Sequence, residues 1–134
     1  AAILSKRTDI NAVLHCHSIH ATALACHKGS IPSFHYMTAV AGGANIRCAE
    51  YATYGTEELS YNVLIALEER YACLLANHGQ VAIGKTIEKA FEIAIEVETL
   101  SHMYLQACQL GEPINLSNKE MDEVLLKFKQ SGYR

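Results

Sequence analysis

The sequence of 134 residues lacks any concentration of positive charge. Its 11 lysine and arginine residues are scattered among 14 aspartate and glutamate residues, and the formal net charge is −3. A nucleic-acid-binding protein needs a basic surface that follows the phosphate backbone. We therefore exclude nucleic acid as an expected partner.

Long apolar runs are missing as well. No stretch reaches the ~18 consecutive apolar residues that a membrane-spanning helix needs. The first residues also lack the basic flank and the apolar segment of a secretory signal. We therefore expect no membrane partner and a cytoplasmic location.

Cysteine spacing of the kind that builds disulfide or thiolate-metal frameworks is absent. The five cysteines are odd in number and scattered, and no two of them form a Cys-x-x-Cys pair. This spacing argues against a disulfide framework and against a thiolate zinc site. We expect reduced thiols, most of them buried as small apolar side chains.

Apolar residues are abundant and make up 50% of the chain, which is enough for the core of a single domain. No internal repeat or linker divides the sequence, so residues 1–134 are treated as one domain. The opening segment AAILSKRTDI is typical of the last turns of a helix. We therefore expect the chain to be an N-terminally truncated part of its domain.

Apolar periodicity and capping residues predict an alternation of strands and helices. Strands are expected at residues 12–17, in the pieces FHYMTAV and IRCAEYA, and on both sides of the turn Asn77-His78-Gly79. Helices are expected from Ser18 to Gly29, from Thr56 to near Arg70, from Thr86 to Gly111 and from Ser117 to near Gly132.

The longest predicted helix carries an apolar stripe of eight residues: Ile87, Ala90, Phe91, Ala94, Val97, Ser101, Tyr104 and Cys108. Additional apolar residues, such as Ile93 and Leu100, indicate packing on more than one side. We expect this helix to contact the sheet and a neighbouring subunit.

The pentapeptide LHCHS at residues 14–18 places two histidines one residue apart. Successive side chains of a β-strand point to opposite faces, so His15 and His17 would project from the same face. Two imidazoles on one face are typical of a metal site, although a single His-x-His pair is a weak motif. A third ligand elsewhere in the chain is needed to support it.

His78 is the best candidate for that third ligand. It ends the apolar segment CLLANH at a turn, and Gly79 after it permits close approach of the backbone. Catalytic zinc is typically held by three protein ligands, often histidines, with a fourth position open. We therefore predict a Zn²⁺ site formed by His15, His17 and His78. The alternative is that the first two are core histidines and the third is an ordinary turn residue.

Two further residues carry weaker signals. His20 lies one helical turn after His17 and would either orient it or be a half-exposed helix residue. Tyr36 follows His35 in the segment PSFHYM, where glycine and proline punctuate the chain and functional groups often collect. A purely structural role is the alternative for Tyr36.

Four segments, in this order and at these separations, resemble the class II aldolase and adducin family: VLHCHSIHATAL, IPSFHYMTAVAGG, IRCAEYATYGTEELS and ACLLANHGQVAIG. The resemblance covers nearly the whole chain. It implies a three-layer α/β/α fold around a central, mainly antiparallel sheet, of which this chain would be the C-terminal two thirds. It also implies a homotetramer with active sites between subunits. On the family pattern His15, His17 and His78 match the metal ligands.

The activity implied by this resemblance is aldol cleavage with zinc as the cofactor. The substrate would be a ketose 1-phosphate such as L-fuculose 1-phosphate, and the products dihydroxyacetone phosphate and an aldehyde such as L-lactaldehyde. Zinc would stabilise the negative charge that develops as the carbon–carbon bond breaks. Tyr36 matches a catalytic tyrosine of the family that reaches a neighbouring subunit's site and handles the proton on the aldehyde oxygen.

The sequence also departs from the family pattern. The phosphate-binding loop, the paired serines and the proton-transfer glutamate of the family have no counterpart in this sequence. We therefore expect the 134-residue chain to bind zinc but to show no measurable aldol cleavage. Near the C-terminus Ser131 stands where the family has a tyrosine, and Tyr133 is displaced from that position, so its role is not assigned.

Two alternatives stay open. One is another catalytic member of the family, such as a pentulose-phosphate 4-epimerase or a sugar-phosphate dehydratase or decarboxylase, although the segments HYM and YATYGT favour the aldolase. The other is a non-catalytic interaction protein of the adducin kind, against which the three histidines argue.

Overall fold

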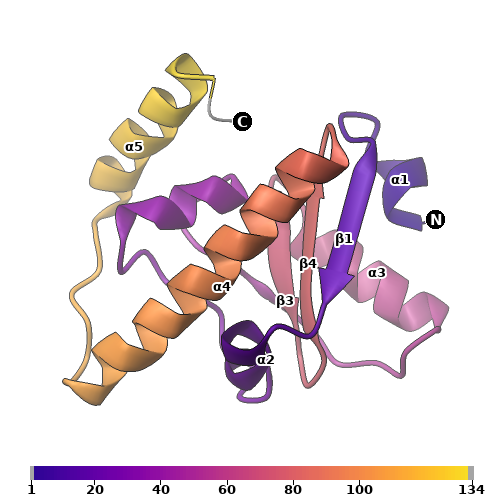
Figure 1. The fold of residues 1–134 in the computed structure, drawn as a ribbon, viewed down its shortest axis with the longest axis horizontal. Coiled ribbons are helices and arrows are strands. Elements are labelled where there is room, and N and C mark those ends of the chain that lie inside the picture. Colours follow the sequence, from indigo (N-terminus) through magenta and orange to yellow (C-terminus); the bar gives the residue numbers. More distant parts are fainter. Residues whose placement is uncertain (1, 133–134) are drawn as a thin grey trace.

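The computed structural model describes residues 2–132, which form helices on both faces of a small sheet (Figure 1). The helices are α1 (Ala2–Lys6), α2 (Ile19–Ala25), α3 (Glu57–Ala66), α4 (Ile87–Gln109) and α5 (Asn118–Gln130), with a 3₁₀ helix η1 (Tyr36–Ala41). The strands are β1 (Ala12–Cys16), β2 (Cys48–Ala49), β3 (Ala72–Leu75) and β4 (Gly79–Gly84).

The described strands form one sheet in the order β1-β4-β3-β2. Strand β4 is antiparallel to both of its neighbours, and the short β2 is parallel to β3. Every residue of β3 and β4 is buried, as expected for central strands that are covered on both faces. The predicted mainly antiparallel sheet is confirmed.

Two apolar cores flank this sheet. Helices α2 and α4 pack on one face, where Leu74 and Ala82 of the sheet meet Val97 and Leu100 of α4. Helices α1 and α3 cover the opposite face (Figure 1), where Val81 belongs to the second core. The predicted three-layer α/β/α architecture is therefore confirmed.

Three helices begin at the capping residues that the sequence predicts. The hydroxyl groups of Thr56, Thr86 and Ser117 each accept a hydrogen bond from the backbone N–H three residues further on. Glu120 completes the predicted capping box by accepting from the N–H of Ser117. Ser18 differs, since it occupies the cap position of α2 but makes no such bond with its own side chain.

The segment FHYMTAV was predicted as a strand, and this prediction is wrong, because residues 36–41 form η1. Local side-chain bonds favour the helical turn: Nδ1 of His35 accepts from the N–H of Met37, and the hydroxyl of Thr38 donates to the carbonyl oxygen of His35. Gly42 then ends η1 with a φ of 96°, in the left-handed region.

Two predicted helix ends also differ from the structure. Helix α2 ends at Ala25, and Lys28 rather than Gly29 takes the left-handed conformation, with a φ of 56°. Helix α3 ends at Ala66, four residues before Arg70. Helix boundaries depend on tertiary packing as well as on local sequence.

The burial of α4 corrects the predicted apolar stripe. Ile87 and Phe91 are more than half exposed, whereas Ile93 and Leu100 are buried against the sheet face. The buried side of α4 keeps Ala90, Ala94, Val97 and Ser101 of the predicted stripe, whereas Ile87 and Phe91 form an exposed apolar row with Ile95.

The cysteines are less buried than expected. Cys73 is buried, Cys16 and Cys48 are half-buried, and Cys26 and Cys108 are exposed. The expectation that most of them are buried is therefore wrong.

None of the helices in residues 2–132 combines the length and apolar character needed to span a bilayer.

Candidate metal centre

Three histidines that are distant in the sequence meet at one end of the sheet. His15 lies in β1 and His17 directly follows that strand, whereas His78 lies in the turn between β3 and β4. Strand β1 pairs with β4 so that Cys16 lies opposite Gln80, two residues after His78. The register of the sheet therefore makes the end of β1 a neighbour of the β3–β4 turn.

The three imidazole rings converge. One ring nitrogen of each histidine lies within 4.8 Å of the other two. The Nε2 atoms of His15 and His78 are 3.2 Å apart. Two nitrogens bound at about 2.0–2.1 Å to one tetrahedral zinc ion are about 3.3 Å apart. The structure thus brings together the three residues predicted from the sequence, at a spacing suited to one metal ion.

A hydrogen bond orients the ring of His15. Its Nδ1 lies 2.9 Å from the backbone carbonyl oxygen of Gln80. Because a carbonyl oxygen can only accept, Nδ1 carries the proton and Nε2 keeps a free lone pair. Metal-bound histidines commonly have their second nitrogen held in this way. The free nitrogen faces His78, as a ligand nitrogen should.

The electrostatics of the cluster favour a neutral ring at His78. Burial lowers the pKa of His78, and the nearby His15 and His17 lower it further, because positive charges on neighbouring rings would repel one another. Neutral imidazole is the form that binds a metal ion. The ring of His78 is therefore suited to bind a metal ion.

Gly79 allows the two strands to approach closely at this point. A Cβ atom added to Gly79 would lie 2.4 Å from the carbonyl oxygen of Cys16 and 3.0 Å from Cδ2 of His17. A real Cβ cannot occupy that space unless β1 moves. The absence of a side chain is what permits His17 to sit beside the turn.

The Gly79→Ala variant should accordingly be less stable and bind metal more weakly. Overpacking at a buried position costs about 1–3 kcal/mol, which urea unfolding would show as a lower free energy of unfolding. Gly29→Ala is the matched control, since nothing lies within 4 Å of a Cβ at Gly29. Equal unfolding free energies and equal zinc affinities for the two variants would contradict this account.

The histidines open onto a cavity of about 710 Å³, a volume within the range of small-molecule sites. Its other lining residues are Tyr51, Ala52, Tyr54 and Asn77. Tyr51 and Tyr54 are 54% and 80% exposed, so they border the mouth of the cavity. Among the described residues that line it, none carries a carboxylate. In this part of the protein, the histidines therefore supply the metal-ligating groups.

Tyr36 lies elsewhere and does not line this cavity. It begins η1, and its ring is 50% exposed. The ring stacks on His35 at a centroid distance of 5.0 Å and meets Phe128 edge-on at 6.5 Å. Within one chain, the predicted catalytic tyrosine and the histidine cluster are thus separate. The role of Tyr36 at a neighbouring subunit's site stays a prediction.

The structure gives His20 a different partner from the one considered in the sequence. His20 is half-buried and its ring bonds to Glu98 rather than to His17.

Gln80 was not predicted as a site residue. A glutamine within the apolar strand GQVAIG is nevertheless an available signal, because a buried polar side chain needs a partner. Tyr133 lies outside the described residues.

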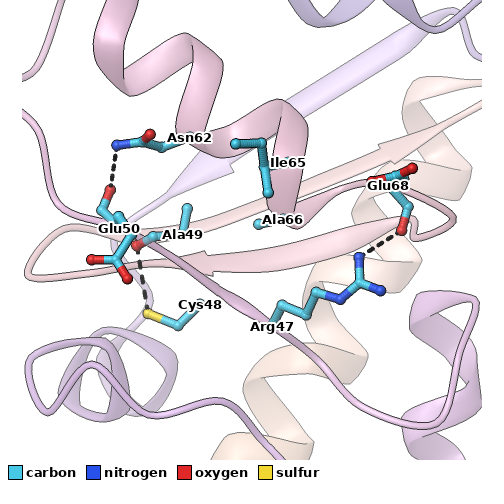
Figure 2. Close-up of a pocket in the computed structure, with 8 residues that line it drawn as sticks. All are labelled: Arg47, Cys48, Ala49, Glu50, Asn62, Ile65, Ala66 and Glu68. Carbon is cyan, nitrogen blue, oxygen red and sulfur yellow. Dashed lines mark hydrogen bonds between the residues drawn. The ribbon is translucent and has the colours of Figure 1, made fainter.

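A second cavity, of about 330 Å³, lies between β2 and α3 (Figure 2). Its polar groups bind within the protein, since Arg47 donates to the carbonyl oxygen of Glu68 and Asn62 donates to that of Glu50. Burial raises the pKa of the Cys48 thiol to about 11, and the negative charge of Glu50 adds to this. The thiol therefore stays protonated and is a poor nucleophile.

Comparisons with known proteins identify the family and the fold. The sequence matches the class II aldolase and adducin N-terminal domain over residues 1–105. It is 50% identical over 130 residues to a 5-methylthioribulose-1-phosphate/5-deoxyribulose-1-phosphate aldolase of Rhodospirillum rubrum, covering 97% of this chain and 59% of that protein. It is 47% identical over 134 residues to the L-fuculose phosphate aldolase of Escherichia coli K12, covering 99% of this chain and 62% of that protein.

A solved structure of an L-fuculose 1-phosphate aldolase is similar in fold, with a TM-score of 0.90 at 47% identity, covering 95% of this chain and 60% of that one. The chain thus spans about three fifths of the length of the curated relatives it matches. The family match extends over most of the chain, and the fold agrees with a solved relative. This chain therefore belongs to the class II aldolase and adducin family.

Proposed function

We propose that this chain carries the metal centre of a zinc-dependent aldolase, which cleaves a ketose 1-phosphate into dihydroxyacetone phosphate and an aldehyde. The observation that carries the proposal is the convergence of His15, His17 and His78 on an open cavity. The similar relatives are named as aldolases of L-fuculose phosphate and of 5-methylthioribulose 1-phosphate, which supports the same class of substrate.

The donor set fits zinc. Three imidazoles with ring nitrogens within 4.8 Å of one another leave one side open to the cavity. Magnesium and calcium prefer oxygen ligands, and no carboxylate of the described residues lines this cavity. A bound Zn²⁺ would supply Lewis-acid stabilisation of the negative charge that develops on substrate oxygens during cleavage.

The residues of this chain would have separate tasks. His15, His17 and His78 would hold the ion, and the carbonyl oxygen of Gln80 would keep the first of them in the correct tautomer. Tyr36 would handle the proton of the substrate hydroxyl group that becomes the aldehyde oxygen during cleavage, at the site of a neighbouring subunit. Tyr36 is half exposed although it contacts His35 and Phe128, which supports a role beyond its own chain.

A homotetramer is the assembly that we propose for this site. The exposed apolar row of Ile87, Phe91 and Ile95 along α4 supports subunit contact, because an apolar surface of this kind is costly to leave in water. Sharing of sites between subunits would also explain why Tyr36 lies away from the histidine cluster of its own chain.

Metal analysis tests the centre directly. After removal of metal with a chelator and dialysis against Zn²⁺, the 134-residue chain should hold one zinc ion per chain. A variant with all three histidines replaced by alanine should hold none, because the ligand set is gone. Elemental analysis of the two proteins gives the answer. Zinc contents that do not differ would contradict the site.

Activity is tested on the product of the complete reading frame. Cleavage of L-fuculose 1-phosphate and of 5-methylthioribulose 1-phosphate releases dihydroxyacetone phosphate. A coupling dehydrogenase reduces this product and oxidises NADH, which is the readout. Cleavage of either substrate supports the proposed reaction. Zinc binding without cleavage of any ketose 1-phosphate would overturn the aldolase assignment and leave a non-catalytic role.

A further inference from the structure

His17 is the ligand whose ring has the least support of its own. It lies between the last residue of β1 and the cap position of α2, and within residues 2–132 no hydrogen bond reaches its ring. His15, in contrast, sits in the strand and bonds to Gln80. The direction of the His17 ring therefore depends on its contacts with the rings of His15 and His78, on its packing beside Gly79 and on its own backbone.

The backbone that follows His17 is held by a carboxylate from another helix. Glu98 of α4 accepts hydrogen bonds from the N–H groups of His20 and Ala21, at 3.0 and 2.9 Å, and from Nδ1 of His20 at 2.6 Å. These N–H groups belong to the first turn of α2, where backbone N–H groups have no acceptor within the helix. Glu98 thus caps the N-terminus of α2, a role that the side chain of the N-cap residue usually has.

Ser18 is bound from the sheet side as well. The fully buried Gln80 donates from Nε2 to the hydroxyl oxygen of Ser18 at 2.9 Å and to the carbonyl oxygen of Ala94 at 3.0 Å. A hydrogen bond from the Ser18 side chain also contributes to the lowered pKa of Glu98. A continuous set of bonds therefore joins β4, the start of α2 and α4 directly beside His17.

The Glu98 carboxylate is held firmly. Burial raises the pKa of Glu98, but the hydrogen bonds from Ala21, His20 and Ser18 outweigh this and hold the pKa below its ordinary value. The ring of His20 is in turn stacked on that of His102, at a centroid distance of 3.9 Å. Glu98 is thus ionised and fixed in place at neutral pH.

We propose that Glu98 is a positioning residue of the metal centre, which fixes the first turn of α2 and thereby orients His17 toward His15 and His78. This inference rests on the proposed metal site. Groups that orient metal ligands typically change metal affinity about 10–100-fold when they are replaced. Glu98 acts one step further back, through the backbone of residues 17–18, and holds it by bonds to two N–H groups and one side chain.

The Glu98→Gln variant of the 134-residue chain tests this role. The amide has the size of the carboxyl group but one acceptor oxygen fewer and no charge. We expect zinc affinity, measured by competition with a chromogenic chelator, to fall about 10–100-fold. The visible spectrum of the Co²⁺-loaded protein should also change, because it reports the coordination geometry. Ser18→Ala should weaken zinc binding in the same direction, and it serves if Glu98→Gln fails to fold.

Glu92→Gln is the matched control. It removes the same charge from an exposed position of the same helix, where Glu92 meets Lys89 at 3.7 Å. Its zinc affinity should stay within about twofold of the original, since exposed ion pairs contribute little. Equal weakening by Glu92→Gln and Glu98→Gln would show an effect of overall charge and overturn the inference. A folded Glu98→Gln protein with unchanged affinity and Co²⁺ spectrum would overturn it too, even if its melting temperature were lower.

Failure of the proposed function has a different signature. If the original chain takes up no zinc, the metal site is wrong, whatever Glu98 does. The positioning role is then read in metal-free protein, from the NMR signals of the His17 ring and from hydrogen exchange of the His20 and Ala21 amides. Glu98→Gln should disturb all of these. Unchanged signals and exchange rates would refute the positioning role.

Discussion

The His78→Ala variant of the complete protein should lose aldol cleavage almost entirely. We expect kcat/KM to fall at least about a thousandfold, because Lewis-acid stabilisation is worth several kcal/mol and each 1.36 kcal/mol is a factor of ten. The Nε2 atom of His78 lies 3.2 Å from that of His15, so the substitution would leave only the two proposed ligands at the end of β1. Zinc content and the rate of dihydroxyacetone phosphate release should fall together.

His27→Ala is the control for this prediction. His27 is also a histidine, but it is exposed in the turn after α2, and the described hydrogen bond of its ring is to the carbonyl oxygen of Ala23 in that helix. Its replacement should leave zinc content and cleavage nearly unchanged. Substantial cleavage by His78→Ala, at zinc contents close to those of the His27→Ala protein, would show that His78 is not a ligand.

Tyr36→Phe should have the second largest effect. The substitution removes only the hydroxyl group, because phenylalanine can keep the ring contacts with His35 and Phe128. Loss of a positioned general acid–base group typically costs about 10²–10⁴-fold in rate. We therefore expect kcat to fall by that factor while zinc content and thermal stability stay the same. Steady-state kinetics and metal analysis of one preparation would measure both.

Mixing of two inactive variants tests whether Tyr36 serves a neighbouring subunit. His78→Ala supplies an intact tyrosine, and Tyr36→Phe supplies an intact histidine cluster. If each site takes its tyrosine from an adjacent subunit, mixed oligomers regain about one quarter of the original sites. No recovery, in oligomers shown to exchange subunits, would place the tyrosine outside the neighbour's site. Tyr36→Phe with full activity would remove it from the reaction altogether.

The sheet and its histidines were predictable because the signals are local. Strand β1 and the β3–β4 pair are apolar runs that end at polar or turn residues, and the alternation of side chains puts His15 and His17 on one face. The turn at Asn77 is equally local, with a φ of 57° that asparagine tolerates better than most residues. What the sequence could not provide was the register that places this turn beside β1.

The support for the site could not be read from the sequence. Glu98 is one of several glutamates on its helix, and its contact with His20 joins residues 78 positions apart. Only the packing of α4 on α2 reveals this contact. Similarly, strand-forming residues around Tyr36 predicted a strand, but side-chain bonds of His35 and Thr38 to the local backbone produce a 3₁₀ helix.

The separation of the ligands along the chain links the metal centre to folding. His15 and His78 are 63 residues apart, and their nitrogens meet only after β1 has docked against β4. In the described sheet β1 is an edge strand, so β4 is its single strand partner. Contacts that close long loops form late, and an ion that binds only the native state stabilises that state by mass action. Zinc bound to the native state would therefore hold β1 against β4.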